Sequence, residues 1–253
     1  MQCLWVIQDS NGKHYNWTEL YKAAFSVGSN AVYVPIDFVS EYEVEKNTHP
    51  IVIGGDDYLN CANKNVDLKN GIFIAPVFFN VPNYMRLWQK KYLNWDTRFI
   101  NSADVSNIEC PFFIRPMHDD KYIDGQVIES NKKISYLQSL FVKERNHILC
   151  VSSVKKLSRE WRAVIVQNKV VAVCRYAKNT ISAVSAIDVP THVMSFIQVN
   201  CQIKNAPNAW VMDVAEYHDE LFVLECNIFN ASNFYDCDRL TIIKAVEKSL
   251  NKK

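Results

Sequence analysis

Near its C-terminal end the chain contains two apolar segments that each carry acids and are separated by only three residues. Residues 210–217 form the first segment, residues 221–227 form the second, and the polar run 218–220 lies between them. Two such segments around a short polar run predict an antiparallel β-hairpin. Because side chains alternate between the two faces of a strand, this hairpin decides which polar residues can meet.

A three-residue turn would place Tyr217 opposite Leu221 and Asp213 opposite Glu225, with Asn227 on the same side. Two facing carboxylates weaken a sheet unless one is protonated or a cation lies between them. Carboxylate and amide oxygens are ligands that Mg²⁺ prefers, so we expect a metal site. The alternative is two solvated acids on a half-exposed hairpin, and a slip of one residue would put them on opposite faces.

A second expected hairpin carries arginines in place of acids. Residues 160–167 and 170–176 are apolar, and a two-residue turn at Asn168-Lys169 would place Arg162 opposite Arg175. Facing guanidiniums repel unless an anion lies between them, and arginine binds carboxylate and phosphate with two hydrogen bonds. The hairpin therefore predicts an anion site. The alternative is that one arginine pairs with Glu160 or another acid and that both are structural.

A third segment suggests a clamp for phosphate. An expected strand at residues 112–114 ends in Arg115, a polar loop contains Lys121, and Gly125 precedes an extended stretch at 126–129. Two basic residues and a glycine around one loop can hold a phosphate chain. The usual glycine-rich nucleotide motifs are absent.

Composition excludes several classes of function. The 253 residues carry a formal net charge of +1, which argues against a broad electrostatic grip on nucleic acid or on an anionic membrane. No run approaches the roughly 20 apolar residues of a membrane span. Residues 1–7 lack a basic start and a cleavage site, so no signal peptide is expected, and the 8 cysteines form no Cys-x-x-Cys motif. We therefore expect a reduced, cytoplasmic protein without a zinc site.

The order of expected elements changes near residue 96. Before it, strands at 3–8, 31–36 and 51–54 and a helix at 17–27 predict a small α/β domain at residues 1–95. After it, short strands and hairpins dominate, and helices are expected at 191–204 and 238–250. The predicted fold class is α+β.

The order of these motifs resembles the ATP-grasp superfamily, and more narrowly its phage and bacterial clade with two arginines and a lysine. The matching words are Phe113-Ile114-Arg115-Pro116, Lys121, Gly125, Arg159-Glu160-Trp161-Arg162, Arg175-Tyr176, Asp213-Val214-Ala215 and residues 225–232. The resemblance covers about residues 96–237. It implies an ATP-grasp domain at 96–253, with α+β lobes at about 96–150 and 151–253.

The resemblance also implies roles for particular residues. Asp213, Glu225 and Asn227 would hold one or two Mg²⁺. Arg115 and Lys121, with Gly125 beside them, would contact the phosphates of ATP, and Val151 and its neighbours would meet adenine through backbone groups. Glu160 would meet the ribose or a substrate amine, and Arg162 and Arg175 the γ-phosphate or the substrate carboxylate.

The implied activity is that of an ATP- and Mg²⁺-dependent carboxylate–amine ligase that works through an acyl phosphate. Its partners would be a small carboxylate and an amine, or a protein or peptide acceptor. The first half is short for the family's usual substrate domain, so the resemblance does not identify the substrate. The alternatives are an ATP-dependent phosphotransferase on the same fold and a non-catalytic interaction module. A nucleic-acid binder is disfavoured by the charge.

Overall fold

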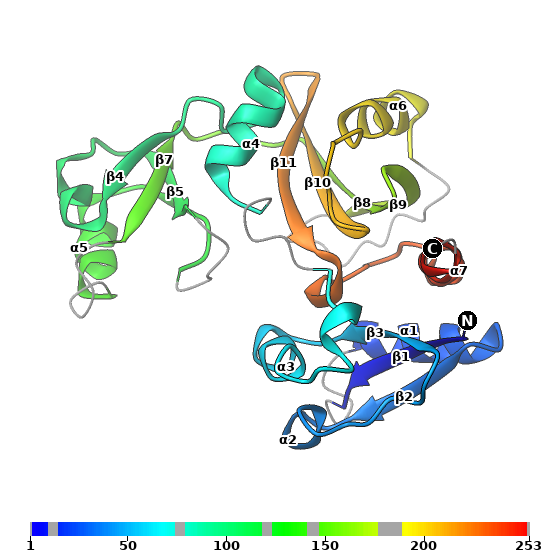
Figure 1. Ribbon diagram of the computed structural model, residues 1–253. Helices are drawn as coiled ribbons and strands as arrows, with labels where there is room; N and C mark the ends of the chain where they lie inside the picture. The colour runs from blue at the N-terminus through cyan, green and yellow to red at the C-terminus, as the bar shows by residue number, and fades with distance from the viewer. Residues whose placement is uncertain are drawn as a thin grey trace. The chain divides into compact units, whose positions relative to one another are not determined.

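The computed structural model describes residues 2–9, 15–73, 79–117, 123–140, 147–176 and 189–251. The chain forms two compact units (Figure 1). Unit 1 comprises Met1–Ala75, Arg159–Val214 and Glu225–Lys253, and unit 2 comprises Pro76–Ser158 and Ala215–Leu224. The first division between the units falls after residue 75, whereas the change in the order of expected elements placed the boundary near residue 96. Residues 1–75 belong to the same compact unit as the C-terminal hairpins.

The N-terminal part of unit 1 is a small parallel sheet with helices, as expected. Its elements are β1 (Gln2–Gln8), α1 (Tyr15–Ser26), β2 (Asn30–Val34), α2 (Ile36–Val39), β3 (Thr48–Ile53), α3 (Asp56–Ala62) and the 3-10 turn η1 (Lys69–Gly71). The strand order is β2-β1-β3, with β1 parallel to both neighbours. A strand–helix–strand order produces this arrangement because parallel strands need a crossover connection.

The remainder of unit 1 is built on a four-stranded sheet in the order β11-β10-β8-β9. These strands are β8 (Arg159–Val166), β9 (Lys169–Tyr176), β10 (Ala209–Tyr217) and β11 (Glu220–Ile228), and the tips of β10 and β11 are counted with unit 2. Helix α6 (Thr191–Asn200) packs on β9, the 3-10 turn η5 (Phe229–Ala231) follows β11, and α7 (Arg239–Leu250) packs on α1, β8 and β9.

One apolar core joins the two parts of unit 1. Its buried members include Trp5, Leu20 and Ile53 from the N-terminal part, together with Val164, Cys174, Val211, Phe229 and Ile243. Burial of such side chains is the main favourable term in folding, so a shared core makes the two parts fold together. The N-terminal segment is therefore not an independent domain.

A fully buried asparagine also ties the parts together. The amide nitrogen of Asn230 donates to the carbonyls of Val52 and Gly71 at 2.6 and 2.9 Å. Its side-chain oxygen accepts from the backbone N–H of Phe73 at 2.7 Å. Each buried backbone group needs a partner, and one side chain here supplies three.

Unit 2 contains a four-stranded antiparallel sheet in the order β4-β7-β5-β6. Its elements are α4 (Val81–Trp88), η2 (Gln89–Lys91), β4 (Arg98–Asn101), η3 (Ser102–Asn107), β5 (Phe112–Pro116), β6 (Gln126–Ile128), α5 (Asn131–Leu140) and β7 (Ile148–Ser152). A separate apolar cluster, which includes Phe112, Ile114 and Leu149, forms its core.

Both hairpins of the larger sheet close with two-residue turns whose central residues have positive φ. In the β8–β9 hairpin these are Gln167 and Asn168, with φ of 49° and 59°. In the β10–β11 hairpin they are His218 and Asp219, with φ of 51° and 60°. Such turns match the right-handed twist of the strands, which favours a two-residue turn over the three-residue turn expected at 218–220. In the arginine hairpin the turn has two residues, as expected, but lies one residue earlier. The expected three-residue turn at 218–220 and the turn at 168–169 are wrong.

The register of the arginine hairpin is set by the earlier turn together with a one-residue shift in pairing. The turn alone would pair Arg162 with Val173 and keep Arg175 on the same face, and the shift reverses this. Arg162 is paired with Cys174, Trp161 is paired with Arg175, and the register shifts between Val164 and Ile165. Arg162 and Arg175 therefore lie on opposite faces of the ribbon, because successive side chains alternate. The prediction that they face each other is wrong.

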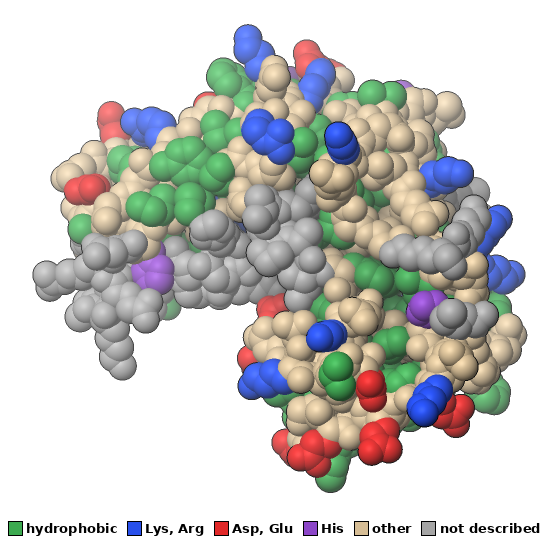
Figure 2. Space-filling model, in the orientation of Figure 1, with side chains coloured by type: hydrophobic (Ala, Val, Ile, Leu, Met, Phe, Trp, Pro, Cys, Tyr) green, Lys and Arg blue, Asp and Glu red, His purple; other side chains and the backbone are tan. Residues whose placement is uncertain are grey.

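The face of the molecule seen in Figure 2 shows no concentration of one charge. Lys and Arg side chains are interspersed with Asp and Glu over it, as the net charge of +1 leads one to expect. None of the helices in the described ranges is long and apolar enough to cross a membrane. All eight cysteines are present as free thiols.

Candidate active site

The centre of the candidate site is a buried ion pair between neighbouring strands. Arg162 on β8 donates through Nε to Asp213 Oδ1 at 2.8 Å and through Nη2 to Asp213 Oδ2 at 2.6 Å. The side chain of Arg162 is 9% exposed and that of Asp213 is 0% exposed. Arginine is suited to this place because its planar fork matches a carboxylate with two parallel hydrogen bonds. The pairing of one arginine with an acid, which the sequence raised as an alternative, is therefore confirmed for Arg162.

Two tyrosines and a backbone carbonyl complete the surroundings of the guanidinium. Arg162 Cζ lies 5.4 Å from the ring centre of Tyr176 and 4.7 Å from that of Tyr235. The two rings are stacked, with centres 4.8 Å apart and planes inclined by 9°. Arg162 Nη1 also donates to the carbonyl of Asn233 at 2.8 Å. The guanidinium is therefore held by a carboxylate, a carbonyl and two aromatic rings.

The hydrogen bonds of Arg162 leave donors uncommitted. A guanidinium has five N–H groups. Two of them go to Asp213 and one to Asn233, so two have no partner among the described residues. These donors, on a side chain held rigidly, are the chemistry that an oxyanion of a ligand requires.

The charges in this pair influence each other strongly. Burial acts to lower the pKa of Arg162, but the charge and hydrogen bonds of Asp213 outweigh it and raise the guanidinium pKa above its ordinary value. Burial raises the pKa of Asp213, while the charge and hydrogen bonds of Arg162 act to lower it. The 2.6 and 2.8 Å contacts have the geometry of a carboxylate, so we treat Asp213 as ionised.

The expected metal ligands do come together. The amide nitrogen of Asn227 lies 3.3 Å from Asp213 Oδ2 and 3.5 Å from Glu225 Oε1, so it stands between the two carboxylates. The charge of Glu225 also acts to raise the pKa of Asp213, after the larger effect of burial. An amide N–H group placed here acts as a weak substitute for a cation, and a turn of the Asn227 amide would present its oxygen instead. Two carboxylates and an amide oxygen fit Mg²⁺, which prefers oxygen ligands.

Other predicted residues of unit 1 divide between the two faces of the arginine hairpin. Glu160 lies two residues before Arg162 and is paired with Tyr176, so it shares the face of Arg162 and Tyr176. Arg175 lies on the opposite face. The structure therefore gathers Glu160, Arg162, Asp213, Glu225 and Asn227 in unit 1 and separates Arg175 from them.

Unit 2 holds the remaining predicted residues. Arg115 lies within β5 and not beyond its end, and it is paired with Cys150. Gly125 packs against this strand, since a Cβ there would lie 2.9 Å from Phe113 Cζ and 3.6 Å from Arg115 Cβ. Val151 is buried within the sheet. Lys121 and its loop at 118–122 lie outside the described residues.

Sequence reasoning missed the aromatic part of the site. Tyr235 lies in a loop between β11 and α7, 73 positions from Arg162 (235 − 162), and no periodic pattern marks it. Its φ of 44° is the structural sign that this loop is constrained.

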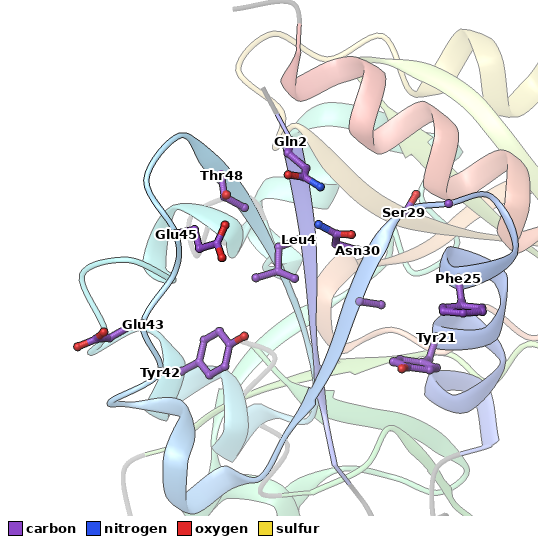
Figure 3. Close-up of a pocket in the computed structure, with 12 residues that line it drawn as sticks. Gln2, Leu4, Tyr21, Phe25, Ser29, Asn30, Tyr42, Glu43, Glu45 and Thr48 are labelled. Atoms are coloured by element: carbon purple, nitrogen blue, oxygen red, sulfur yellow. The ribbon is translucent and has the colours of Figure 1, made fainter.

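A depression of about 630 Å³ elsewhere in unit 1 contains none of the predicted residues. Figure 3 shows its lining, which includes Leu4, Tyr21, Phe25, Tyr42 and Glu45 around the N-terminal strands. The predicted site residues therefore do not line this depression.

Comparisons with known proteins address the same segment. Residues 93–245 match the sequence profile of an ATP-grasp domain, family 2 of the clade named for two arginines and a lysine. A search among curated proteins gave no match.

Several solved structures share the fold of the chain. A RimK domain protein ATP-grasp from Sphaerobacter thermophilus has 12% sequence identity and a TM-score of 0.60, covering 96% of this chain and 99% of that chain. The D-alanine–D-alanine ligase of Bacillus anthracis has 11% identity and a TM-score of 0.63, covering 99% and 98%. The ATP-grasp ligase PsnB complexed with minimal precursor has 10% identity and a TM-score of 0.62, covering 99% of both chains. At these identities the likeness shows the fold, and the expected ATP-grasp architecture is confirmed.

Proposed function

Because the chain belongs to family 2 of the ATP-grasp clade named for two arginines and a lysine, we propose that it is an ATP-dependent ligase that forms C–N bonds by joining a carboxylate to an amine. The ligase folds found among solved structures support this activity. The proposed route passes through an acyl phosphate. A substrate carboxylate oxygen attacks the γ-phosphorus of ATP and ADP leaves; the amine then attacks the acyl carbon, loses a proton, and phosphate leaves.

The observation that carries the proposal is the state of Arg162. It is buried, charged and rigidly held, yet two of its five N–H groups have no partner among the described residues. Leaving a buried donor unsatisfied costs about 1–3 kcal/mol, so a protein gains from a ligand that takes it up. An oxyanion of phosphate or carboxylate is such a ligand.

The first step of the reaction brings two anions together, so the site must reduce their repulsion. Arg162 would do this with its N–H groups, and Asp213 would keep the guanidinium charged and oriented. Asp213, Glu225 and Asn227 would hold Mg²⁺, which when bound supplies positive charge to the phosphate oxygens. Positioning and electrostatics of this kind do not require a protein nucleophile.

The other nucleotide contacts are also part of the proposal. Arg115, Lys121 and Gly125 would contact the phosphates. The backbone near Val151 would contact the adenine, and Glu160 would contact the ribose or the substrate amine. Arg175 lies on the face opposite Arg162, so in the proposal it does not share the anion that Arg162 binds.

The class of acceptor is a further part of the proposal. PsnB was solved in complexes with a minimal precursor and with a precursor peptide. We propose that this chain likewise takes an amino acid or a peptide as one partner, with a small carboxylate or amine as the other.

The test is ADP release by the purified protein with Mg²⁺ and ATP, supplied with sets of carboxylates, amines and short peptides. We expect ADP release that needs both a carboxylate and an amine, and a coupled product whose mass is the sum of the two minus water. ADP release that needs no amine, with a stable phosphorylated product, would instead indicate a phosphotransferase. Absence of ADP release and of Mg²⁺–ATP binding would refute the proposal and leave a non-catalytic module.

A further inference from the structure

The loop that follows β11 is built around the guanidinium of Arg162. The carbonyl of Asn233 accepts from Arg162 Nη1 at 2.8 Å, and the ring of Tyr235 lies 4.7 Å from Arg162 Cζ. Two contacts from residues two positions apart reach the same group. Such a convergence requires the loop to hold a defined shape.

Hydrogen bonds give the loop that shape. The side-chain oxygen of Asn233 accepts from the backbone N–H of Tyr235 at 2.6 Å. The carbonyl of Tyr235 accepts from Arg239 Nη2 at 2.5 Å, which ties the loop to the first turn of α7. Tyr235 has a φ of 44°, in a region that a bulky side chain rarely adopts. Conformations of this kind persist where their surroundings enforce them, and they cluster at functional sites.

The second ring comes from the end of β9. Tyr176 stacks on Tyr235 at 4.8 Å and lies 5.4 Å from Arg162 Cζ. Aromatic faces attract a guanidinium within about 6 Å of the ring centre, and more strongly where water is excluded. The two rings therefore restrict rotation of the guanidinium about its own bonds without using any of its N–H groups.

We propose that Tyr235 and Tyr176 are positioning residues that fix the plane of Arg162, so that its two uncommitted N–H groups aim at the terminal phosphate of ATP. This inference rests on the proposed function, because it takes Arg162 to be the group that meets that phosphate. Asp213 fixes the charge and one edge of the guanidinium, Asn233 fixes a third N–H, and the rings fix the plane. Loss of a ring should therefore affect a nucleotide with a γ-phosphate and spare one without it.

The test compares binding of Mg²⁺–AMPPNP and Mg²⁺–ADP by calorimetric titration. Tyr235→Gly removes the ring and keeps a residue that tolerates positive φ, and Tyr235→Asn does the same with a second side chain. We expect either variant to weaken AMPPNP binding about tenfold and to change ADP binding less than about twofold. Tyr235→Phe keeps the ring and should restore AMPPNP affinity to within about twofold of wild type.

A matched control is available in the N-terminal part of unit 1. Tyr33 in β2 stacks on Tyr21 at 4.2 Å and 17°, and neither tyrosine is a proposed site residue. Tyr33→Leu should leave the affinities for both nucleotides unchanged. The Arg162 Nε–H signal in ¹⁵N NMR spectra of the protein without added nucleotide gives a second measurement. We expect this signal to be sharp in wild type and in Tyr235→Phe, and broadened in Tyr235→Gly.

The possible results separate the two levels of the argument. If wild type binds neither nucleotide, the proposed function fails and the positioning role fails with it. If wild type binds both and Tyr235→Gly weakens both equally, or weakens neither, the positioning role alone is overturned. A selective loss of AMPPNP affinity that Tyr235→Phe restores supports it.

Discussion

Replacement of Arg162 by methionine gives the most direct test of the electrostatics of the site. Methionine keeps much of the apolar side-chain volume and removes the charge and the donors. The partner, Asp213, is 0% exposed and would lose its bonds at 2.6 and 2.8 Å. Removing one partner of a buried ion pair destabilises a protein by about 3–5 kcal/mol, because the other charge is left without compensation.

The loss should depend on pH in a definite direction. Without Arg162, burial raises the pKa of Asp213 with little to oppose it. Taking up a proton then costs about 4 kcal/mol at pH 7 and about 1.5 kcal/mol at pH 5, since each pH unit above the ordinary value of about 3.9 costs about 1.36 kcal/mol. A group whose folded pKa is raised favours folding most below its unfolded pKa, so the destabilisation should shrink as pH falls.

The assay is urea unfolding of wild type and Arg162→Met at pH 5 and pH 7, with EDTA present. We expect the difference in unfolding free energy to be about 2.5 kcal/mol smaller at pH 5. The double variant Arg162→Met with Asp213→Leu should recover part of the loss at pH 7, because neither charge is then buried alone. The exposed Arg86, which donates to Asn83, is the matched control, and Arg86→Met should change stability by less than about 0.5 kcal/mol. A penalty independent of pH, together with a double variant less stable than the single one, would refute the reasoning.

Three further predictions concern other parts of the chain. Burial acts to raise the pKa of Asp96, but hydrogen bonds from Lys155 and Ser153 outweigh it and lower the pKa. The contribution of Asp96 to stability should therefore be present at neutral pH and lost as pH falls below about 4. In urea unfolding between about pH 3 and 6, Asp96→Asn should reduce the fall in unfolding free energy toward acid pH, and an unchanged fall would contradict the prediction. Asn230→Ala leaves three buried backbone groups without their partner and should lower the free energy of unfolding by about 3–5 kcal/mol in urea melts, whereas a loss below about 1 kcal/mol would show that water replaces the amide. Glu225→Gln should weaken binding of Mn²⁺ as a probe for Mg²⁺ by about tenfold in calorimetric titration, because one carboxylate charge is removed, and unchanged affinity would exclude Glu225 as a ligand.

Much of the local structure followed from the sequence. Apolar segments around a short polar run, at 160–176 and at 210–227, predicted two hairpins, and both are present. The spacing of Glu225 and Asn227 placed them on one side of a strand, and the Asn227 amide does lie beside Glu225. These predictions succeed because the period of a strand is a local property that each segment expresses by itself.

The partner of each arginine was decided by the register of the sheet. The turn lies one residue earlier than expected, which by itself moves the pairing by two residues and leaves the faces unchanged. The one-residue shift in pairing between Val164 and Ile165 is what puts Arg175 on the face opposite Arg162. The sequence contains little information on the register, because several short turns suit the same polar residues. A slip of the pairing by one residue moves a side chain to the other face of the sheet. The shifted pairing between Val164 and Ile165 is likewise visible only in the folded sheet.

The sequence by itself therefore determined the hairpins and the kinds of residue that could bind a nucleotide, because these depend on neighbours within a few positions. The tertiary structure alone joined Arg162 to Asp213 across 51 positions, brought Tyr235 against the guanidinium, and buried Asn230 against Val52. Contacts of this kind depend on which strands become neighbours and on which core closes over them. The free energy that selects these contacts comes from the burial of apolar side chains throughout unit 1, so it cannot be read from any one segment of the sequence.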